Sequence, residues 1–436
     1  MSDLLMAGAA KRCVTPPTWV PYLTSSGNGA CEPFEGVHDE LYARALVLDD
    51  GRCSIAVLSV DSIGYDNAIL GPDRNFTAEL RSLVASRTGL AREGVMLTAT
   101  HSHSTPETLG LTPFRETDGI QEWLEGHLET LASTVTEAWE KRTAVRAYAG
   151  VTQVPGVSRH RRILLKDGTL NRAGALPALE AAAGTWAVDE ALSVLYLEAL
   201  TGQPQAVMVN YSAHPVVAML LPPVSADYPG ALTASVEEGL DGATCLFVNG
   251  ACGNVNSIRV TTGFDDVAWI GRTLGRGTLD EIARLKNGPP LRSTRVAYDT
   301  DRLELDPRPC PPLEEAEKTS ARSPSSENRR ALRLARKLAE GSLQVEVQAM
   351  ALGRLRWVAL PGEVFVETGL AIKRAGAWFV TGNANGWVGY FPIHRAYEEG
   401  GYEVVAGPWS RVAPGSAERL EAVCIRQMER FAAQCV

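Results

Sequence analysis

The sequence predicts an α/β fold in which mixed β-sheets are flanked by helices. Short β-rich runs alternate with amphipathic helical stretches along the chain, which is typical of sheets covered by helices. The composition is that of an ordinary globular protein, because 45% of the residues are hydrophobic and 21% are charged. The chain of 436 residues exceeds the ~250–300 residues at which a single core usually stops growing. We therefore expect either two lobes or one large α/β domain.

Individual elements follow from hydrophobic periodicity and from the residues that bound each run. Strands are predicted where short apolar, β-branched runs occur, at residues 54–60, 94–100, 193–199, 206–211, 244–248 and 354–360. Helices are predicted where apolar residues recur at helical spacing, at residues 78–87, 120–141, 232–240, 267–285 and 417–432. Residues 306–330 are rich in proline, serine and charge, so we expect a linker or an exposed, solvated excursion there.

The charge pattern argues against nucleic acid as a partner. The formal net charge is −9, and no basic stripe with interleaved aromatic residues occurs. No run reaches the ~18 consecutive apolar residues that a membrane span needs, so we expect no stable membrane insertion. Residues 1–7 lack the charged and apolar regions of a secretory signal, which predicts a cytoplasmic location. The sequence leaves self-association into a homo-oligomer open.

The eight cysteines show no C-x-x-C pair and no zinc-finger spacing. We expect them to be reduced and mostly buried as small apolar residues. Only Cys252 lies near a segment of chemical interest, the glycine-rich turn at residues 247–257. That turn has neither the dinucleotide-binding nor the P-loop spacing, so we interpret it as a structural corner rather than a nucleotide site.

Polar residues that can bind a metal follow several of the predicted strands directly. Asp61, His101 with His103, His214 and Glu363 each come just after an apolar run. In α/β sheets, ligands bind in the crevice beyond the carboxyl ends of the strands. The pattern therefore indicates that several strands deliver side chains to one site.

Each of these residues also has a purely structural interpretation. His101 and His103 lie on the same side of an extended segment, where such a pair either binds zinc or caps the strand end. His214 precedes Pro215, which disfavours helix at that point, and a His-Pro turn is commonly structural. Glu363 follows a Pro-Gly turn, where a carboxylate also stabilises the first turn of a helix. Their occurrence together favours the metal interpretation.

Two histidines and one glutamate form a ligand set for a catalytic Zn²⁺ that keeps one position open for water. Zinc lowers the pKa of that water to ~7 and so supplies a nucleophile. The sequence contains no G-x-S-x-G elbow, and the serines near His101 show no spacing that favours a Ser-His-Asp triad. The residues therefore favour a zinc-dependent hydrolase with one Zn²⁺ per chain over a serine hydrolase.

Six collinear motifs resemble the catalytic domain of the neutral, non-lysosomal ceramidases and their shorter bacterial relatives. They span roughly residues 7–409 and occur in the family's order. The segments that carry them are AGAAKRCVTPP with GVHDELYARALVL, THSHSTP, YSAHP with SADYPGAL, FVNGACGNVNS, LPGE and GWVGYFPIHRAYEEGGYE. The resemblance implies a single ceramidase-like zinc hydrolase domain over residues 1–436, with residues 306–330 as an exposed excursion.

The resemblance also implies a ligand set for the metal. The family binds zinc through two histidines, a glutamate and a tyrosine, which correspond by motif position to His101, His214, Glu363 and Tyr390. The two histidines and the glutamate are those that the strand pattern indicates. Tyr390 enters only through the resemblance, because a tyrosine in a glycine-rich turn usually packs or forms a hydrogen bond.

The family's remaining catalytic groups correspond to His103, Tyr402 and an arginine of the segment VSRHRR, which is Arg161 or alternatively Arg159. Each can donate a hydrogen bond to the oxyanion that forms when water attacks a carbonyl, an effect worth ~2.7–4 kcal/mol per donor. His103 or Tyr402 can also protonate the leaving amine.

The chain departs from the family at positions that bear on the substrate. Asn254 and Asn256 stand where the family has Asp and Ser, Thr105 stands where it has Gly, and His160 stands where it usually has Asn. The resemblance ends near residue 409, so we expect no counterpart of the C-terminal β-sandwich of the ceramidases. These departures predict a small-molecule amide or N-acyl substrate rather than ceramide.

Two alternative functions remain open at this point. The same site would serve an esterase, a lactonase or a cyclic-amide hydrolase, since activated water attacks all of these carbonyls. The altered turn with Asn254 and Asn256 also leaves open a non-catalytic binding protein on the same fold. Nitrogen and oxygen ligand sets accept divalent metals other than zinc as well.

Overall fold

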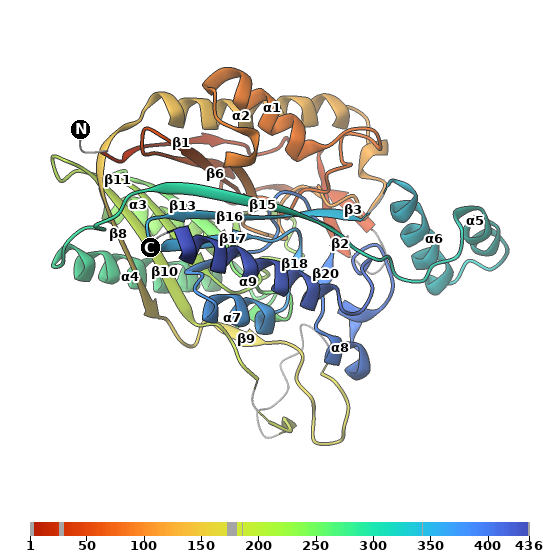
Figure 1. Cartoon of the computed structure of the whole chain (residues 1–436). Helices are drawn as coiled ribbons and strands as arrows, with labels where there is room; N and C mark the ends of the chain where they lie inside the picture. The colour runs from red at the N-terminus through yellow and green to blue at the C-terminus, as the bar shows by residue number, and fades with distance from the viewer. Residues whose placement is uncertain (1–3, 26–29, 172–180, 185, 342, 435–436) are drawn as a thin grey trace.

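The chain folds into four layers in the order helices, sheet, sheet, helices (Figure 1). The computed structural model describes residues 4–25, 30–171, 181–184, 186–341 and 343–434. Both sheets are mixed, and helices cover the outer face of each. The α/β class with mixed sheets and flanking helices is therefore confirmed.

The larger sheet has eight strands. Most neighbours are antiparallel, whereas β6–β7 and β11–β13 are parallel. The strand order is β13 (Thr244–Asn249), β11 (Pro204–Tyr211), β10 (Ala191–Ala199), β8 (Thr143–Gln153), β1 (Met6–Cys13), β5 (Tyr42–Asp49), β6 (Ser54–Val60) and β7 (Val95–Ala99).

The two halves of this sheet are joined weakly and curve toward each other. Strands β8 and β1 pair through only two residues of each strand. At the other end of the strand order, the Ser59 hydroxyl donates to the Phe247 carbonyl. Beside it, the Asn249 amide donates to the Thr100 carbonyl at 3.0 Å. The carboxyl ends of β7 and β11 therefore meet, although these strands lie far apart in the sheet order.

Apolar side chains fill both faces of the larger sheet. In β5, Ala43, Ala45 and Val47 face the helices, whereas Leu46 and Leu48 face the second sheet. Successive side chains of a strand point to opposite faces, so a strand buried on both faces is apolar throughout. This double burial explains the continuous apolar runs in the sequence.

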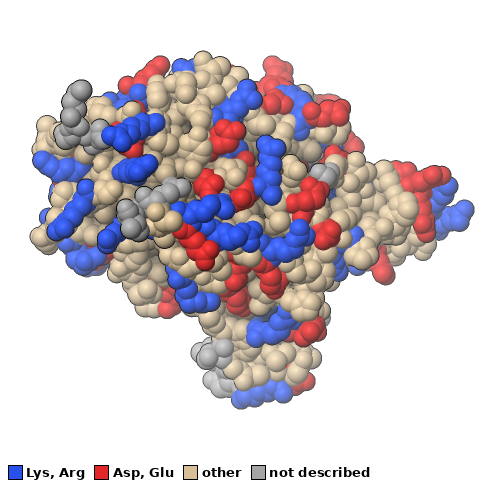
Figure 2. Space-filling model, viewed as in Figure 1, with Lys and Arg blue, Asp and Glu red and all other residues tan. Residues whose placement is uncertain are grey.

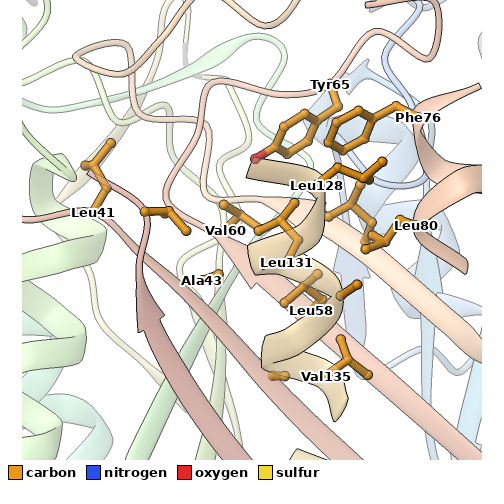
Figure 3. Close-up of a cluster of buried hydrophobic side chains, with 14 of the residues drawn as sticks. Leu41, Ala43, Leu58, Val60, Tyr65, Phe76, Leu80, Leu128, Leu131 and Val135 are labelled. Carbon is orange, nitrogen blue, oxygen red and sulfur yellow. The ribbon is translucent and has the colours of Figure 1, made fainter. Parts of the chain in front are cut away.

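Four helices cover the outer face of the larger sheet. They are α1 (Phe76–Thr88) and α2 (Ile120–Glu140) over one half, and α3 (Asp227–Gly239) and α4 (Phe264–Lys286) over the other. Figure 3 shows Leu128, Leu131 and Val135 of α2 beside Leu58 and Val60 of β6. The spacing of the α2 residues by three and four places them on one face of the helix, which is the buried face.

Close approach of α2 to the sheet requires a glycine in β1. A Cβ atom on Gly8 would lie 2.1 Å from the carbonyl oxygen of Ala138 in α2. Any side chain at this position would therefore push the helix away from the sheet.

The second sheet packs on the inner face of the first. It consists of β15 (Val296–Glu304), β16 (Gln344–Leu352), β17 (Leu355–Ala359) and β19 (Phe379–Thr381). Trp357 and Phe379 face the larger sheet, whereas Val358 and Val380 face the outer helices. Those helices are α7 (Val366–Arg374) and α9 (Ser416–Gln434).

Short ladders connect the loops at the carboxyl ends of the strands. The pairs are β2 (Pro21–Ser25) with β3 (Ala30–Pro33), β4 (Gly36–Val37) with β12 (Pro223–Val224), β9 (Ser158–His160) with β14 (Val255–Ser257), and β18 (Glu363–Val364) with β20 (Tyr390–Phe391). Helix α8 (His394–Glu399) follows β20.

Residues 306–330 contain helices rather than an irregular linker. Helix α5 (Leu313–Arg322) and helix α6 (Ser326–Ala339) form a hairpin that projects from one end of the molecule in Figure 1. Lys337 of α6 contacts buried Asp66 at 3.2 Å and so anchors the hairpin to the core. Figure 2 shows acidic and basic side chains interspersed over the projection, as expected for a solvated surface.

No helix in the described part of the chain combines the length and apolarity that crossing a membrane requires. The seven cysteines within the described residues are all free thiols. Cys252 is buried, and burial raises the pKa of its thiol. Its side chain therefore lacks the thiolate character that a nucleophile or metal ligand needs.

Candidate active site

Two histidines, each in the loop that follows a different strand, meet just beyond the carboxyl ends of β7 and β11. His101 follows β7, and His214 follows β11. Their Nε2 atoms lie 3.2 Å apart, and both residues are at most 1% exposed. The curvature of the larger sheet brings these two ends together.

Backbone carbonyls orient both imidazole rings. Nδ1 of His101 lies within hydrogen-bond distance of the Ile63 carbonyl, and Nδ1 of His214 lies 2.6 Å from the Cys252 carbonyl. A carbonyl only accepts, so each Nδ1 must carry the proton. The Nε2 lone pairs then face each other, an arrangement that is repulsive unless a cation lies between them.

Glu363 completes a compact set of three ligand atoms. Its Oε2 lies 3.0 Å from Nε2 of His214 and 3.5 Å from Nε2 of His101. The Trp387 indole donates to the other carboxylate oxygen at 3.3 Å, which fixes the carboxylate orientation. Ligands placed 2.0–2.2 Å from a tetrahedral ion are about 3.3–3.6 Å apart. The three atoms thus have nearly the spacing that a zinc ion imposes.

His103 lies beside this set as a potential further ligand. The ligand atoms of His101, His103 and His214 lie within 4.8 Å of one another. This triplet is looser than the set with Glu363, whose separations are 3.0–3.5 Å. His103 Nε2 is buried and has no hydrogen-bond partner among the described residues. We therefore regard His103 as a neighbour of the other three candidate ligands, with one nitrogen that has no partner among the described residues.

Backbone pairing holds Tyr390 next to Glu363. The two residues are register partners in the parallel β18–β20 ladder. The Tyr390 hydroxyl lies 2.9 Å from the Tyr402 hydroxyl and accepts a hydrogen bond from Arg161 at 3.0 Å. The structure thus places Tyr390 beside Glu363, the candidate ligand with which it shares the pocket lining.

Arg161 is the arginine that reaches the site. It is 6% exposed, and besides Tyr390 it donates to the Glu403 carboxylate at 3.1 Å and to the Asn256 side-chain oxygen at 3.0 Å. Arg159, the alternative, is half-buried in β9 and is the register partner of Asn256 in the β14 ladder. We therefore place Arg161 in the site in preference to Arg159.

Burial and neighbouring charges shift the pKa values of these site residues. Burial opposes ionisation of Glu363, but the adjacent His101 and His214 outweigh it and hold its pKa well below the usual range. Burial and nearby Arg161 lower the pKa of His214 to about 4. Burial and the Glu363 charge raise the pKa of the Tyr390 phenol. Burial and the neighbouring charges thus favour a neutral imidazole at His214 and an ionised carboxylate at Glu363.

The glycine-rich turn at residues 247–257 links the site residues to one another. The Cys252 carbonyl orients His214, and the Gly253 carbonyl accepts from Arg161. The Gly253 amide donates to the Val364 carbonyl next to Glu363, at 2.9 Å. A Cβ atom on Gly253 would lie 2.5 Å from the Glu363 carbonyl oxygen, so only glycine allows this approach. The turn is thus a structural corner, as the sequence predicts, and it also positions three side chains of the site.

A pocket of about 250 Å³ opens onto these groups. Its polar lining comes from Arg161, Asn256, Glu363, Tyr390 and Tyr402. Its apolar lining consists of Leu111, Met219, Val260, Trp387 and Trp409. Ligand pockets usually measure ~300–1,000 Å³, so this one suits a small substrate.

Comparison with known proteins relates this architecture to solved structures. No family model matches the chain, and no curated protein matches its sequence. The neutral ceramidase from Pseudomonas aeruginosa matches it with a TM-score of 0.70 over 99% of this chain and 75% of that chain, at 16% identity. A ceramidase complexed with C2 matches with a TM-score of 0.73 over 99% of this chain and 76% of that chain, at 15% identity.

The chain has a ceramidase-like fold. At these identities the likeness concerns the fold. The expectation of a ceramidase-like architecture, which rests on six sequence motifs, is confirmed by matches that span nearly the whole chain.

Some functional contacts were missed at the sequence level. Glu403 is 1% exposed and binds Arg161 and Arg162, and Trp387 holds Glu363. Glu403 directly follows Tyr402, but no sequence signal links it to arginines 241 and 242 positions away. Asp61, which also follows a strand, lies elsewhere in an ion pair with Arg44 at 2.7 Å.

Proposed function

We propose that this chain is a metal-dependent hydrolase that cleaves an amide bond of a small or N-acyl substrate. The observation that carries the proposal is the mutual approach of three ligand atoms, from His101, His214 and Glu363, to within 3.0–3.5 Å. Buried groups with facing lone pairs and a carboxylate are the donor set of catalytic zinc sites with three protein ligands. Tyr390 is the fourth ligand in this proposal, as the family resemblance implies.

A zinc ion held by these residues would lower the pKa of a water molecule to ~7 and polarise the substrate carbonyl. The residues around it have separate tasks. Tyr402 and His103 donate hydrogen bonds to the oxyanion as it develops on the attacked carbonyl. His103, whose Nε2 has no partner among the described residues, can also accept the proton that the attacking water releases and pass it to the leaving amine.

Arg161 acts largely through its neighbours. Four of the five N–H groups of its guanidinium have partners in Glu403, Asn256, Gly253 and Tyr390. One N–H group of Nη1 remains for the oxyanion. Arg161 therefore contributes by holding the Tyr390 hydroxyl and by keeping a positive charge beside the reacting carbonyl.

Esters, lactones and cyclic amides are alternative substrates for the same site, because activated water attacks each of these carbonyls. The names of the two structural neighbours, both ceramidases, favour the amide. The apolar pocket walls and the limited volume favour a short acyl or amine group over a ceramide.

Metal analysis tests the proposal directly. Protein purified without added metal is compared with His214→Ala and with the exposed control His394→Ala. We expect about one zinc per chain in the wild type and in the control, and loss of both metal and amide hydrolysis in His214→Ala. Full hydrolytic activity of metal-free protein, or unchanged zinc and turnover in His214→Ala, would refute the proposal. A zinc-loaded protein that hydrolyses neither amides nor esters would instead support a binding role.

A further inference from the structure

We infer that Asn256 selects substrates that carry an acceptor oxygen next to the scissile carbonyl. The inference rests on the proposed function and concerns the substrate class of the same site. Asn256 is 6% exposed and lines the pocket together with Glu363 and Tyr390.

The orientation of the Asn256 amide follows from its neighbour. Arg161 Nη1 lies 3.0 Å from Oδ1 of Asn256. A guanidinium contains only donors, so the amide oxygen must face it and the amide NH₂ must face away. Arg161 is itself held by Glu403 and the Gly253 carbonyl, which prevents the amide from turning over.

The NH₂ group of Asn256 has no acceptor among the described residues. It is also not among the buried polar atoms that are sealed from solvent without a partner. On a residue that lines the pocket, these two facts place the NH₂ group at the pocket surface. Two N–H donors are thus available to a bound molecule.

The position of Asn256 relates these donors to the reaction. Asn256 forms a β-bridge with His214, and it shares the Arg161 guanidinium with Tyr390. Among the described residues that line the pocket, Glu363 supplies the only carboxylate, and the metal would occupy it in the proposed function. The free part of the Asn256 side chain therefore offers donors rather than acceptors beside the reacting carbonyl. A substrate with an ether, carbonyl or carboxylate oxygen at that point satisfies them, whereas a hydrocarbon leaves both N–H donors unpaired, which is unfavourable.

Two pairs of amides that differ only by CH₂ or O test the inference. N-butylacetamide and N-(2-methoxyethyl)acetamide place the oxygen on the amine side of the scissile bond. N-ethylbutanamide and N-ethyl-2-methoxyacetamide place it on the acyl side. Wild type is expected to prefer the ether in one pair by about 10- to 100-fold in kcat/KM, and that pair identifies the side that Asn256 contacts.

Asn256→Asp keeps the acceptor for Arg161 and removes both donors, with nearly the same shape. The ether preference should disappear or reverse in this variant, because carboxylate and ether oxygens repel each other. Asn328→Asp, at a half-buried position near the start of α6 that does not line the pocket, is the control and should keep the preference. If Asn256→Asp does not fold, Asn256→Ser, which retains one hydrogen-bond donor, replaces it as the test variant. Equal rates within both pairs for wild type, or an unchanged preference in Asn256→Asp, would overturn the inference.

Binding separates this inference from the proposed function. Butanoate and methoxyacetate are titrated calorimetrically into zinc-loaded protein, which requires no turnover. Tighter binding of methoxyacetate by wild type but not by Asn256→Asp supports an acyl-side role of Asn256 even if no amide is hydrolysed. If the two acids bind equally and neither amide pair shows a preference for the ether in hydrolysis, the inferred role of Asn256 is contradicted, whichever reaction the site catalyses.

Discussion

Glu363 and Tyr390 are register partners in a parallel ladder of two residues per strand. The ladder joins the segment after β17 to the segment before α8, so backbone hydrogen bonds rather than side-chain packing set the distance between carboxylate and phenol. Arg161 and Tyr402 then hold the phenol hydroxyl from the other side. In the proposed function, the pair links the proposed metal ligands to the groups proposed to stabilise the oxyanion.

Tyr390→Phe should weaken zinc binding and turnover without unfolding the protein. The substitution removes the hydroxyl that contacts Arg161 and Tyr402, while the ring stays packed. Loss of such a group typically lowers metal affinity or activity 10- to 100-fold. Chelator competition and kcat measure the two effects. Tyr148→Phe, at a hydroxyl that contacts remote Glu198, is the matched control, and equal effects of both variants would argue against a role for Tyr390.

Glu403→Gln should destabilise the protein strongly. The carboxylate is 1% exposed and accepts from Arg161 at 3.1 Å and from Arg162 at 2.8 Å. Removing the charge leaves buried Arg161 without its carboxylate partner and leaves Arg162 with only the more exposed Glu399, and breaking such a buried pair typically costs about 3–5 kcal/mol. Urea denaturation measures the free energy of unfolding. Glu399→Gln, at the more exposed partner of Arg162, should cost under ~1 kcal/mol, and a similar cost for both would contradict this account.

Glu107→Gln should flatten the pH dependence of stability. Burial raises the pKa of Glu107 to about 7. The folded protein therefore holds the proton more tightly than the unfolded chain does. This stabilisation is complete below pH ~4.5 and is lost as pH rises through 7, which corresponds to at most about 3 kcal/mol. Denaturation at pH 5, 6, 7 and 8 measures the slope for both proteins. Parallel profiles would show that Glu107 does not contribute.

Leu131→Ala should lower the free energy of unfolding by about 2–5 kcal/mol. Leu131 is fully buried between α2 and the larger sheet, where Figure 3 places it near Leu58. The shortened side chain leaves a cavity that the rigid strands cannot fill. Glu122→Ala, on the exposed side of the same helix, should change stability by under ~0.5 kcal/mol. A loss below 1 kcal/mol for Leu131→Ala would contradict the packing described for this layer.

The strands that were predicted from the sequence are mostly buried on both faces, although β5 and β16 are similarly buried and were not predicted. The run at residues 54–60 is apolar throughout and coincides with β6. Strand β8 was missed because glycine, threonine and arginine interrupt its apolar positions, and β15 was missed because most of its residues are only half-buried. The helices of residues 306–330 were missed because prolines and serines mark their ends, and such composition is also typical of linkers.

Part of the site could be predicted from the sequence because polar side chains that can bind a metal directly follow several of the strands. His101, His214 and Glu363 could be selected as candidate ligands because each follows an apolar run, and the structure brings their side chains together. The same rule also selects Asp61, which lies in an ion pair with Arg44 instead. Tyr390 and Arg161 required the family resemblance, because their contacts depend on loop conformations that no local periodicity encodes. Contacts such as Glu403 with Arg161, 242 positions apart, follow only from the folded chain.

The three ligand atoms come from positions separated by 113 and 149 residues. An ion held between them would cross-link the two halves of the larger sheet to the second sheet. It would thereby help to close the long chain segments between the three positions, and closing such loops has an entropic cost. If it binds only the folded state, metal at 1,000 times its Kd adds about 4.1 kcal/mol to the free energy of unfolding. Chelation would then lower the melting temperature of the whole molecule rather than loosen one loop, and neither half of the chain alone would retain the ion.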